Sequence, residues 1–351
     1  GRYSLTEMIE DRTDWEDDVG LLAAGLRRLT EELSLLSRFG ESWRILEERA
    51  ADLRETFLFV GLPDPDTPSD SYVYWYERRE RAISLSATPV RVADDLKMTL
   101  YSTVPSCILT SATLSTGGRF DYIRDRLGLG EDIETLQLRS PFNYQDRSIL
   151  YVPEERFPEP TQPGYEAAVC ERIEDILRIT GGRALVLFTS FKGMDAVAEY
   201  LRERISYPVL VQGTASRARL LNLFREQTDS VLLAVASFWE GVDIPGKSLT
   251  AVIIDKLPFE VPSDPVVQAR MQAVRNNGGN PFIEFQVPRA VLTLRQGVGR
   301  LMRSTGDCGL ISIMDIRLFS KRYGRIFLKS MPPSPVVRKL GEGENFLIAL
   351  E

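Results

Sequence analysis

Apolar residues recur every three or four positions near the start of the chain, as along one face of an amphipathic helix. The repeat consists of Val19, Leu22, Leu26, Leu29, Leu33 and Leu36. A capping box at 13–16 predicts the start of this helix, and Phe39-Gly40 predicts its end. A second helix, capped by Ser42, follows after a short turn. We therefore expect an antiparallel helical hairpin with Leu26, Leu29 and Leu33 buried between its helices.

The next part of the chain has the composition of β-strands. Strands are expected at 57–60, 72–76 and 83–85, with a Pro- and Asp-rich loop over 61–71. Tyr72, Tyr74 and Tyr76 share one strand face, where tyrosines either stack on nucleic-acid bases or simply pack a sheet. A short helix at 94–100 is expected before a strand at 107–110.

From Asp146 onward apolar strands alternate with amphipathic helices. The expected strands are 148–152, 184–188, 209–211, 231–236, 251–254 and 309–313. The expected helices are 165–180, 193–205, 216–227, those starting at Pro265 and Pro288, and 319–329. This order predicts an α/β fold with a mostly parallel sheet covered on both faces. The glycine-rich residues 341–344 are expected to be flexible.

Composition describes an ordinary globular protein of 351 residues with 43% hydrophobic and 26% charged residues. This length predicts about two or three domains. The net charge of −7 excludes a generally basic surface, so any nucleic-acid site must be local. No apolar run is long enough to span a membrane. The absence of histidine excludes every histidine-based triad, base or metal site. Cys107, Cys170 and Cys308 fit reduced, mostly buried thiols of a cytoplasmic protein.

One polar stretch, Gln296 to Arg303, follows the expected helix at Pro288. If that helix continues, Gln296, Arg300 and Arg303 form one stripe, because they are four and three positions apart. Gly297 and Gly299 would let another backbone or a ligand come close. Paired guanidiniums suit a polyanion such as phosphate, although a solvated basic face is the simpler alternative.

A second stretch, Ser237 to Gly246, follows the apolar run 231–236. It contains Glu240, Gly241, Asp243 and a proline. Loops of this kind at the carboxyl end of a buried strand are where open α/β sheets bind ligands.

Four stretches in this order resemble motifs of the superfamily-two helicases, in particular their DinG/XPD branch. They are 111–114 (motif III), 184–190 (motif IV), 237–246 (motif V) and 296–303 (motif VI). The resemblance implies the C-terminal half of such a protein. It further implies a helical hairpin belonging to the arch domain (1–56), a C-terminal remnant of motor domain one (57–120) and a RecA-like motor domain two (121–351).

No P-loop sequence and no acidic Walker-B box with a following histidine occur in the chain. In the family these lie before the arch, as do the cysteines of an iron–sulfur cluster. We therefore expect a piece of a longer protein, which does not hydrolyse ATP by itself. Most of the ATP and Mg²⁺ contacts, and any iron–sulfur cluster, would belong to the missing part, and no metal site is expected here.

The resemblance also implies roles for single residues. Arg300 and Arg303 would act as arginine fingers with Gln296 beside them, while Glu240, Gly241, Asp243 and Gly299 would face the nucleotide. Thr189, Ser190, Gln212 and Gly213 would bind DNA phosphates, and Ser111 and Thr113 would couple the two sites. An ordinary helix N-cap at Thr189-Ser190 is an alternative that is compatible with phosphate binding.

These expectations together describe part of an ATP-dependent 5′-to-3′ DNA helicase. Its partners would be single-stranded DNA and motor domain one of the same protein, and it would be cytoplasmic. The alternative is a non-catalytic nucleic-acid-binding or regulatory module derived from a motor domain. The two arginines favour the enzyme, since a module without ATP chemistry has no use for them.

Overall fold

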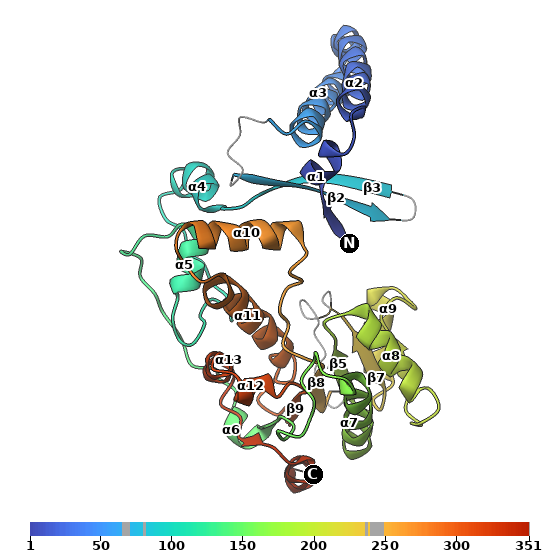
Figure 1. The fold of residues 1–351 in the computed structure, drawn as a ribbon, viewed down its shortest axis with the longest axis vertical. Helices are drawn as coiled ribbons and strands as arrows, with labels where there is room; N and C mark the ends of the chain where they lie inside the picture. The colour runs from blue at the N-terminus through green and yellow to red at the C-terminus, as the bar shows by residue number, and fades with distance from the viewer. Residues whose placement is uncertain (65–70, 80–81, 236–237, 239–248, 351) are drawn as a thin grey trace. The chain divides into compact units, whose positions relative to one another are not determined.

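A computed structural model describes residues 1–64, 71–79, 82–235, 238 and 249–350 (Figure 1). The chain forms two compact units. The first contains 1–106, 126–128 and 260–285, and the second contains 107–125, 129–259 and 286–351. These units divide the chain differently from the domains expected from the sequence, because 107–120 joins the second unit and 260–285 joins the first.

The first unit contains the expected helical hairpin, made of α2 (Trp15–Ser37) and α3 (Glu41–Gly61) (Figure 1). The capping box is wrong in detail. The N-cap is Asp14, whose carboxylate accepts from Arg12 at 2.9 Å and makes no cap bond. The buried residues of the hairpin include Val19 and Ala23 on α2 and Ala50 and Val60 on α3.

The expected burial of Leu29 is wrong, because this side chain is 49% exposed, while Leu26 and Leu33 are half-buried. The small residues Ala23 and Gly61 bring the helices close together, and a Cβ on Gly61 would lie 3.3 Å from Val19. The seam therefore includes Val19 of the apolar repeat but continues through Ala23, while Leu22 is exposed.

Residues 57–60 are the last turns of α3 and not a strand. An all-apolar run of four residues carries no periodicity that separates a strand from a helix, and here the helix simply continues. The expected domain boundary at residue 56 therefore falls inside this helix.

A three-stranded antiparallel sheet follows, in the order β1 (Arg2–Ser4), β2 (Tyr72–Arg79) and β3 (Ala82–Pro89). Tyr74 is 7% exposed and packs with Leu5 of α1 (Leu5–Glu10) and with Val60. The ring of Tyr72 meets Phe59 edge-on at 5.2 Å. Ordinary sheet packing therefore accounts for these two tyrosines. The unit also contains α4 (Ala93–Leu96), the π-helix η1 (Lys97–Tyr101) and α10 (Pro265–Asn276).

The second unit is built on a seven-stranded parallel sheet in the order β10-β4-β9-β8-β5-β7-β6. Its strands are β4 (Ser148–Tyr151), β5 (Ala184–Leu187), β6 (Val209–Val211), β7 (Val231–Ala234), β8 (Ala251–Ile254), β9 (Gly309–Ile313) and β10 (Val336–Val337). Strands β4, β5, β7, β8 and β9 are buried along their whole length, as their continuous apolar runs predicted.

Helices cover both faces of this sheet, so the expected α/β architecture is confirmed. One face packs against α9 (Arg217–Glu226), α11 (Val287–Val298) and α13 (Gly324–Ser330). The other packs against α7 (Tyr165–Thr180), α8 (Phe191–Leu201) and α14 (Leu340–Leu350). A fully buried Leu or Ile in either layer contributes about 1.5–3 kcal/mol.

The α7–β5 connection depends on the glycine pair Gly181-Gly182. Both residues have positive φ angles, and a Cβ on Gly182 would lie 1.9 Å from the carbonyl oxygen of Asp229. Only glycine fits this close approach between neighbouring connections.

Four expectations about elements are corrected. Residues 107–110 are not a strand, since in the described part of the chain no strand pairs with them, and Ile108 is 89% exposed. The stripe 296–303 is not one helix, because α11 ends at Val298. The helix 319–329 is two helices, α12 (Arg317–Ser320) and α13, and the flexible 341–344 is the start of α14. Short helices α5 (Asp121–Leu127) and α6 (Tyr144–Arg147) and the π-helix η3 (Phe282–Gln286) complete the described elements.

The three cysteines are free, but Cys107 is exposed, so the expectation of mostly buried thiols does not hold for it. Burial raises the pKa of the Cys170 thiol. In the residues that the structure describes, no helix has both the length and the apolar character needed to cross a membrane.

Candidate functional site

The carboxyl ends of neighbouring strands collect several of the residues singled out from the sequence. Thr189 and Ser190 follow β5, Gln212 and Gly213 follow β6, and Asp255 follows β8. Because β6, β7, β5 and β8 are parallel neighbours, these residues lie along one edge of the sheet. We call this the carboxyl edge.

Thr189 is committed to a buried carboxylate. Its amide donates to Asp255 Oδ1 at 3.0 Å, and its hydroxyl donates to Oδ2 at 3.2 Å. The amide of Lys256 donates to the same Oδ1 at 2.8 Å. Burial raises the pKa of Asp255 to about 7, against the opposing influence of Lys256 and these hydrogen bonds. Thr189 therefore fixes the end of β5 to the end of β8. Of the pair Thr189-Ser190, it is Ser190 that lies at the start of a helix, where an anion could bind.

Ser190 is the N-cap of α8. Its hydroxyl accepts from the amide of Gly193 at 3.2 Å, which is the capping alternative raised from the sequence. The remaining amides of the first helical turn have no partner inside a helix and make this end suited to an anion. The exposed ammonium of Lys192 pairs with Glu166 at 2.8 Å beside it. Phosphate binding at this helix end stays a prediction.

Gln212 and Gly213 shape the neighbouring loop. The side-chain oxygen of Gln212 accepts from the amide of Val235 at 2.8 Å, so it braces the residue that directly follows β7. Gly213 has φ +98° in open space, a conformation that favours glycine. Glu240, Gly241 and Asp243 of motif V lie outside the described residues. Phe238 of that motif is 2% exposed in the core.

Tyr165 and Asp315 connect the carboxyl ends of β8 and β9. The Tyr165 hydroxyl donates to the carbonyl of Asp255 and to that of Met314, the latter at 3.1 Å. Asp315 is fully buried and accepts from the amide of Leu257 at 2.9 Å and from the Arg317 guanidinium at 2.6 Å. The carboxyl edge is thus held together by side chains that lie just after β5, β6, β8 and β9.

The motif VI residues lie elsewhere, where the chain enters β9. After α11 ends, Gly299 to Arg303 form a turn whose Leu301 and Met302 are 2% and 1% exposed. Arg300 and Arg303, on either side of these anchors, are half-buried, as is Gln296 in the last turn of α11. The carboxylate of Asp307 accepts from the amides of Arg303 and Ser304, both at 2.7 Å. The turn therefore presents the two arginines from a fixed backbone, which replaces the helical stripe expected from their spacing.

Motif III lies against this region within the same unit. Arg295 of α11 donates to the carbonyl oxygens of Ser115 at 2.6 Å and Ala112 at 2.9 Å. Ser111 and Thr113, whose hydroxyl oxygens are 3.1 Å apart, are exposed and half-buried respectively. Burial lowers the pKa of Arg295, although the nearby Tyr144 acts in the opposite direction.

Only some of these supporting residues have a recognisable pattern in the sequence. Asp307 stands three positions after Ser304, the spacing of a capping turn, and could have been recognised. Asp255 and Arg295 could not, because their partners are 66 and 180 or more residues away.

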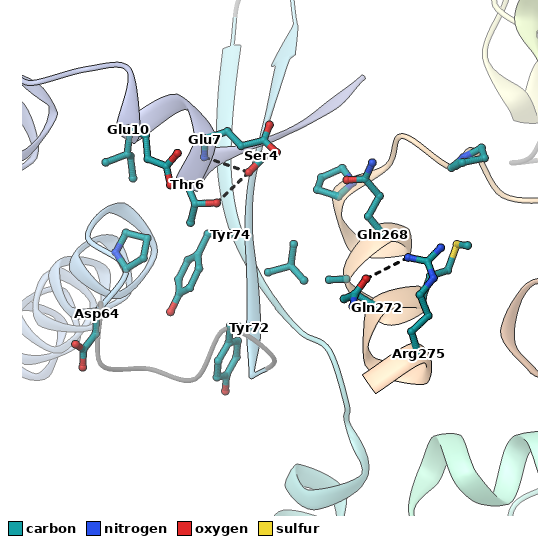
Figure 2. Close-up of a pocket in the computed structure, with 17 residues that line it drawn as sticks. Ser4, Thr6, Glu7, Glu10, Asp64, Tyr72, Tyr74, Gln268, Gln272 and Arg275 are labelled. Carbon is teal, nitrogen blue, oxygen red and sulfur yellow. Dashed lines mark hydrogen bonds between the residues drawn. The ribbon is translucent and has the colours of Figure 1, made fainter. Parts of the chain in front are cut away.

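The first unit contains a separate cavity of about 880 Å³ (Figure 2). It is lined by residues of α1, β2 and α10 and by Pro63 and Asp64. Glu7, Glu10 and Asp64 bring negative charge, and Gln268, Gln272 and Arg275 come from α10. Within the parts of the chain that are described, no group of three or more His, Cys, Asp or Glu side chains is arranged to hold a metal ion.

Comparison with known proteins agrees with the α/β fold. Residues 173–334 match the family model of the helicase C-terminal domain. The ATP-dependent DNA helicase YoaA of Haemophilus influenzae is 40% identical over 341 residues, which cover 97% of this chain and 50% of that protein. The ATP-dependent helicase DinG of Mycobacterium tuberculosis is 38% identical over 277 residues, 77% of this chain and 41% of its own length. The chain thus spans about half, or less, of these relatives.

Among solved structures, one described as an XPD helicase has a TM-score of 0.57 at 18% identity, covering 88% of this chain and 56% of its own. The parallel sheet, the helical layers on both its faces and the family match together define a RecA-like helicase domain. Residues 173–334 thus form a helicase C-terminal domain, and the chain as a whole is similar to the helicases named YoaA and DinG.

Proposed function

We propose that the full-length protein is an ATP-dependent DNA helicase that moves 5′ to 3′ on single-stranded DNA. This region would supply arginine fingers to ATP held on motor domain one, together with part of the DNA track. The names of the relatives support ATP-dependent helicase activity. The hairpin α2–α3 would belong to the arch, and strands β2 and β3 of the first unit would belong to motor domain one.

One observation carries the arginine-finger assignment: the turn after α11 holds Arg300 and Arg303 on a backbone fixed by two buried side chains and by Asp307. Phosphoryl transfer depends on fixed positive charge near the transferred group, because flexible groups must reorganise as charge develops. A rigid turn with two guanidiniums meets this requirement better than a solvated helix face does.

The DNA track would follow the carboxyl edge, where Ser190 caps α8 and Gly213 leaves a backbone without a side chain. Thr189 would act there through Asp255, by fixing the backbone next to Ser190. Phosphate contacts of this kind position a strand without reading its sequence.

The test uses the full-length protein with Arg300→Ala and Arg303→Ala. Each is expected to lower DNA-stimulated ATP hydrolysis by about 10³-fold or more, while affinity for single-stranded DNA changes by less than about twofold. Lysine variants should fail as well, since an ammonium lacks the planar pair of donors. Arg325→Gln, an exposed arginine on α13, is the matched control.

A salt titration of DNA binding separates the alternatives. If the arginines contact DNA phosphates, each variant lowers the slope of log affinity against log salt by about one unit and leaves ATP turnover intact. That result would move the arginines to the DNA track. A full-length protein without any ATP turnover would instead support the non-catalytic module.

A further inference from the structure

The guanidinium of Arg295 holds two points of a segment that is 180 and more residues earlier in the chain. One terminal nitrogen donates to the carbonyl of Ser115 at 2.6 Å, and the other donates to the carbonyl of Ala112 at 2.9 Å. A planar fork with fixed donor directions can bridge two carbonyls in this way, whereas a lysine ammonium is a point charge on a flexible stem.

The held segment is fixed on one side and open on the other. Ser115 is 5% exposed, and the amide of Gly117 donates to the Ser330 hydroxyl of α13 at 2.7 Å. Ser111, at the start of the segment, is exposed and bonds only locally in the described contacts, to Thr113. Arg295 and Ser330 therefore fix one side of the segment, while Ser111 stays exposed.

The backbone of the same arginine marks where the motif VI turn begins. Its carbonyl accepts from the amide of Gly299 at 2.9 Å, and the amide of Arg300 then donates to Gly297 at 3.1 Å. A Cβ on Gly299 would lie 3.0 Å from this carbonyl, so the turn packs tightly onto Arg295. One residue thus joins motif III through its side chain and motif VI through its backbone.

We propose that Arg295 is a positioning residue that ties the 111–115 segment to the turn bearing Arg300 and Arg303, so that a displacement of one displaces the other. The proposal rests on the proposed function. It makes Arg295 the link between residues 111–115 and the two arginines Arg300 and Arg303, without direct contact to ATP or DNA.

The first test measures the tie alone, by hydrogen exchange on the 351-residue chain. Arg295→Gln should speed exchange at the amides of Thr113, Thr116 and Gly117 by about tenfold or more. Exchange in the central strands should stay unchanged, which shows that the variant folds. Arg295→Lys should exchange at rates between those of the wild type and Arg295→Gln. Arg325→Gln should exchange at the wild-type rates. Unchanged exchange in the Gln variant would overturn the proposal.

The second test measures coupling in the full-length protein. Arg295→Gln should lower the ratio of DNA-stimulated to basal ATP hydrolysis by about tenfold, with the KM for ATP and the Kd for single-stranded DNA within about twofold of wild type. Faster exchange with an unchanged ratio would show a merely structural bond and overturn the role. A wild-type protein without ATP hydrolysis would refute the proposed function, while the exchange experiment would still decide whether the tie exists.

Discussion

Asp255, at the end of β8, is only 5% exposed. Its carboxyl group accepts three hydrogen bonds. Burial disfavours its charged form, which raises its pKa from 3.8 to about 7. The folded protein therefore binds a proton at this site more tightly than the unfolded chain does. The stability that this group contributes is complete below about pH 4 and is lost as pH rises towards 7.

Asp255→Asn should remove this pH dependence. The amide oxygen can still accept from Thr189 and Lys256, and the amide nitrogen can donate to the Thr189 hydroxyl, as a protonated carboxyl would. In wild type, Asp255 should lower the free energy of unfolding by at most about 1.4 kcal/mol per pH unit between about pH 4 and 7. Urea unfolding at several pH values measures the difference between wild type and variant.

Asp195→Asn, at an exposed position of α8, is the control and should leave the pH profile unchanged. If the Asp255 variant loses stability equally at every pH, the carboxyl stays ionised in the folded protein throughout this range.

At the same scale, the sequence located Ser190 well because a capping residue is recognised from its immediate neighbours. Asp255 and Arg295 are ordinary residues whose importance comes from partners far along the chain, which only the fold brings together. The arginines of motif VI were singled out by residue type, and the helical stripe expected for them was wrong because α11 ends at Val298.

At the scale of elements, the hairpin allows a direct comparison of two apolar positions on one helix. Val19 is 3% exposed, and Leu29 is 49% exposed. Val19→Ala should cost about 1.5–3 kcal/mol of stability, while Leu29→Ala should cost less than about 1 kcal/mol. Thermal or urea unfolding of the chain measures both. A larger loss at Leu29 would mean that the leucine repeat is buried in solution, as in an oligomerising coil.

The predicted elements were wrong where the local sequence pattern and the long-range packing disagree. The run 57–60 reads equally well as strand or helix, and the preceding α3 decides it. Residues 107–110 have a strand's composition, but a strand needs a neighbour for its backbone hydrogen bonds. The helix at Pro288 stops early because Leu301 and Met302 enter the core. The parallel sheet was predicted almost strand for strand, since buried strands are continuous apolar runs.

For the whole molecule, we expect the 351-residue chain alone not to hydrolyse ATP, because its sequence contains no P-loop to hold the phosphates. A coupled ATPase assay with single-stranded DNA, on protein purified in two independent ways, measures this. Turnover that follows the chain through both purifications, and that Arg303→Ala abolishes, would show that the nucleotide site is complete within these residues.

The order of strands in the large sheet has a consequence for synthesis of the chain. In the described residues β4 pairs with β9 and β10, and β9 also separates β4 from β8. The first of these strands to leave the ribosome therefore has no neighbour until residues 309–313 have been made, about 160 residues later. Until then β4 and one side of β8 are open apolar edges, which invite pairing with other chains. The sheet can close only after β9 has been made, and nascent chains that stop before β9 should require a chaperone to remain soluble.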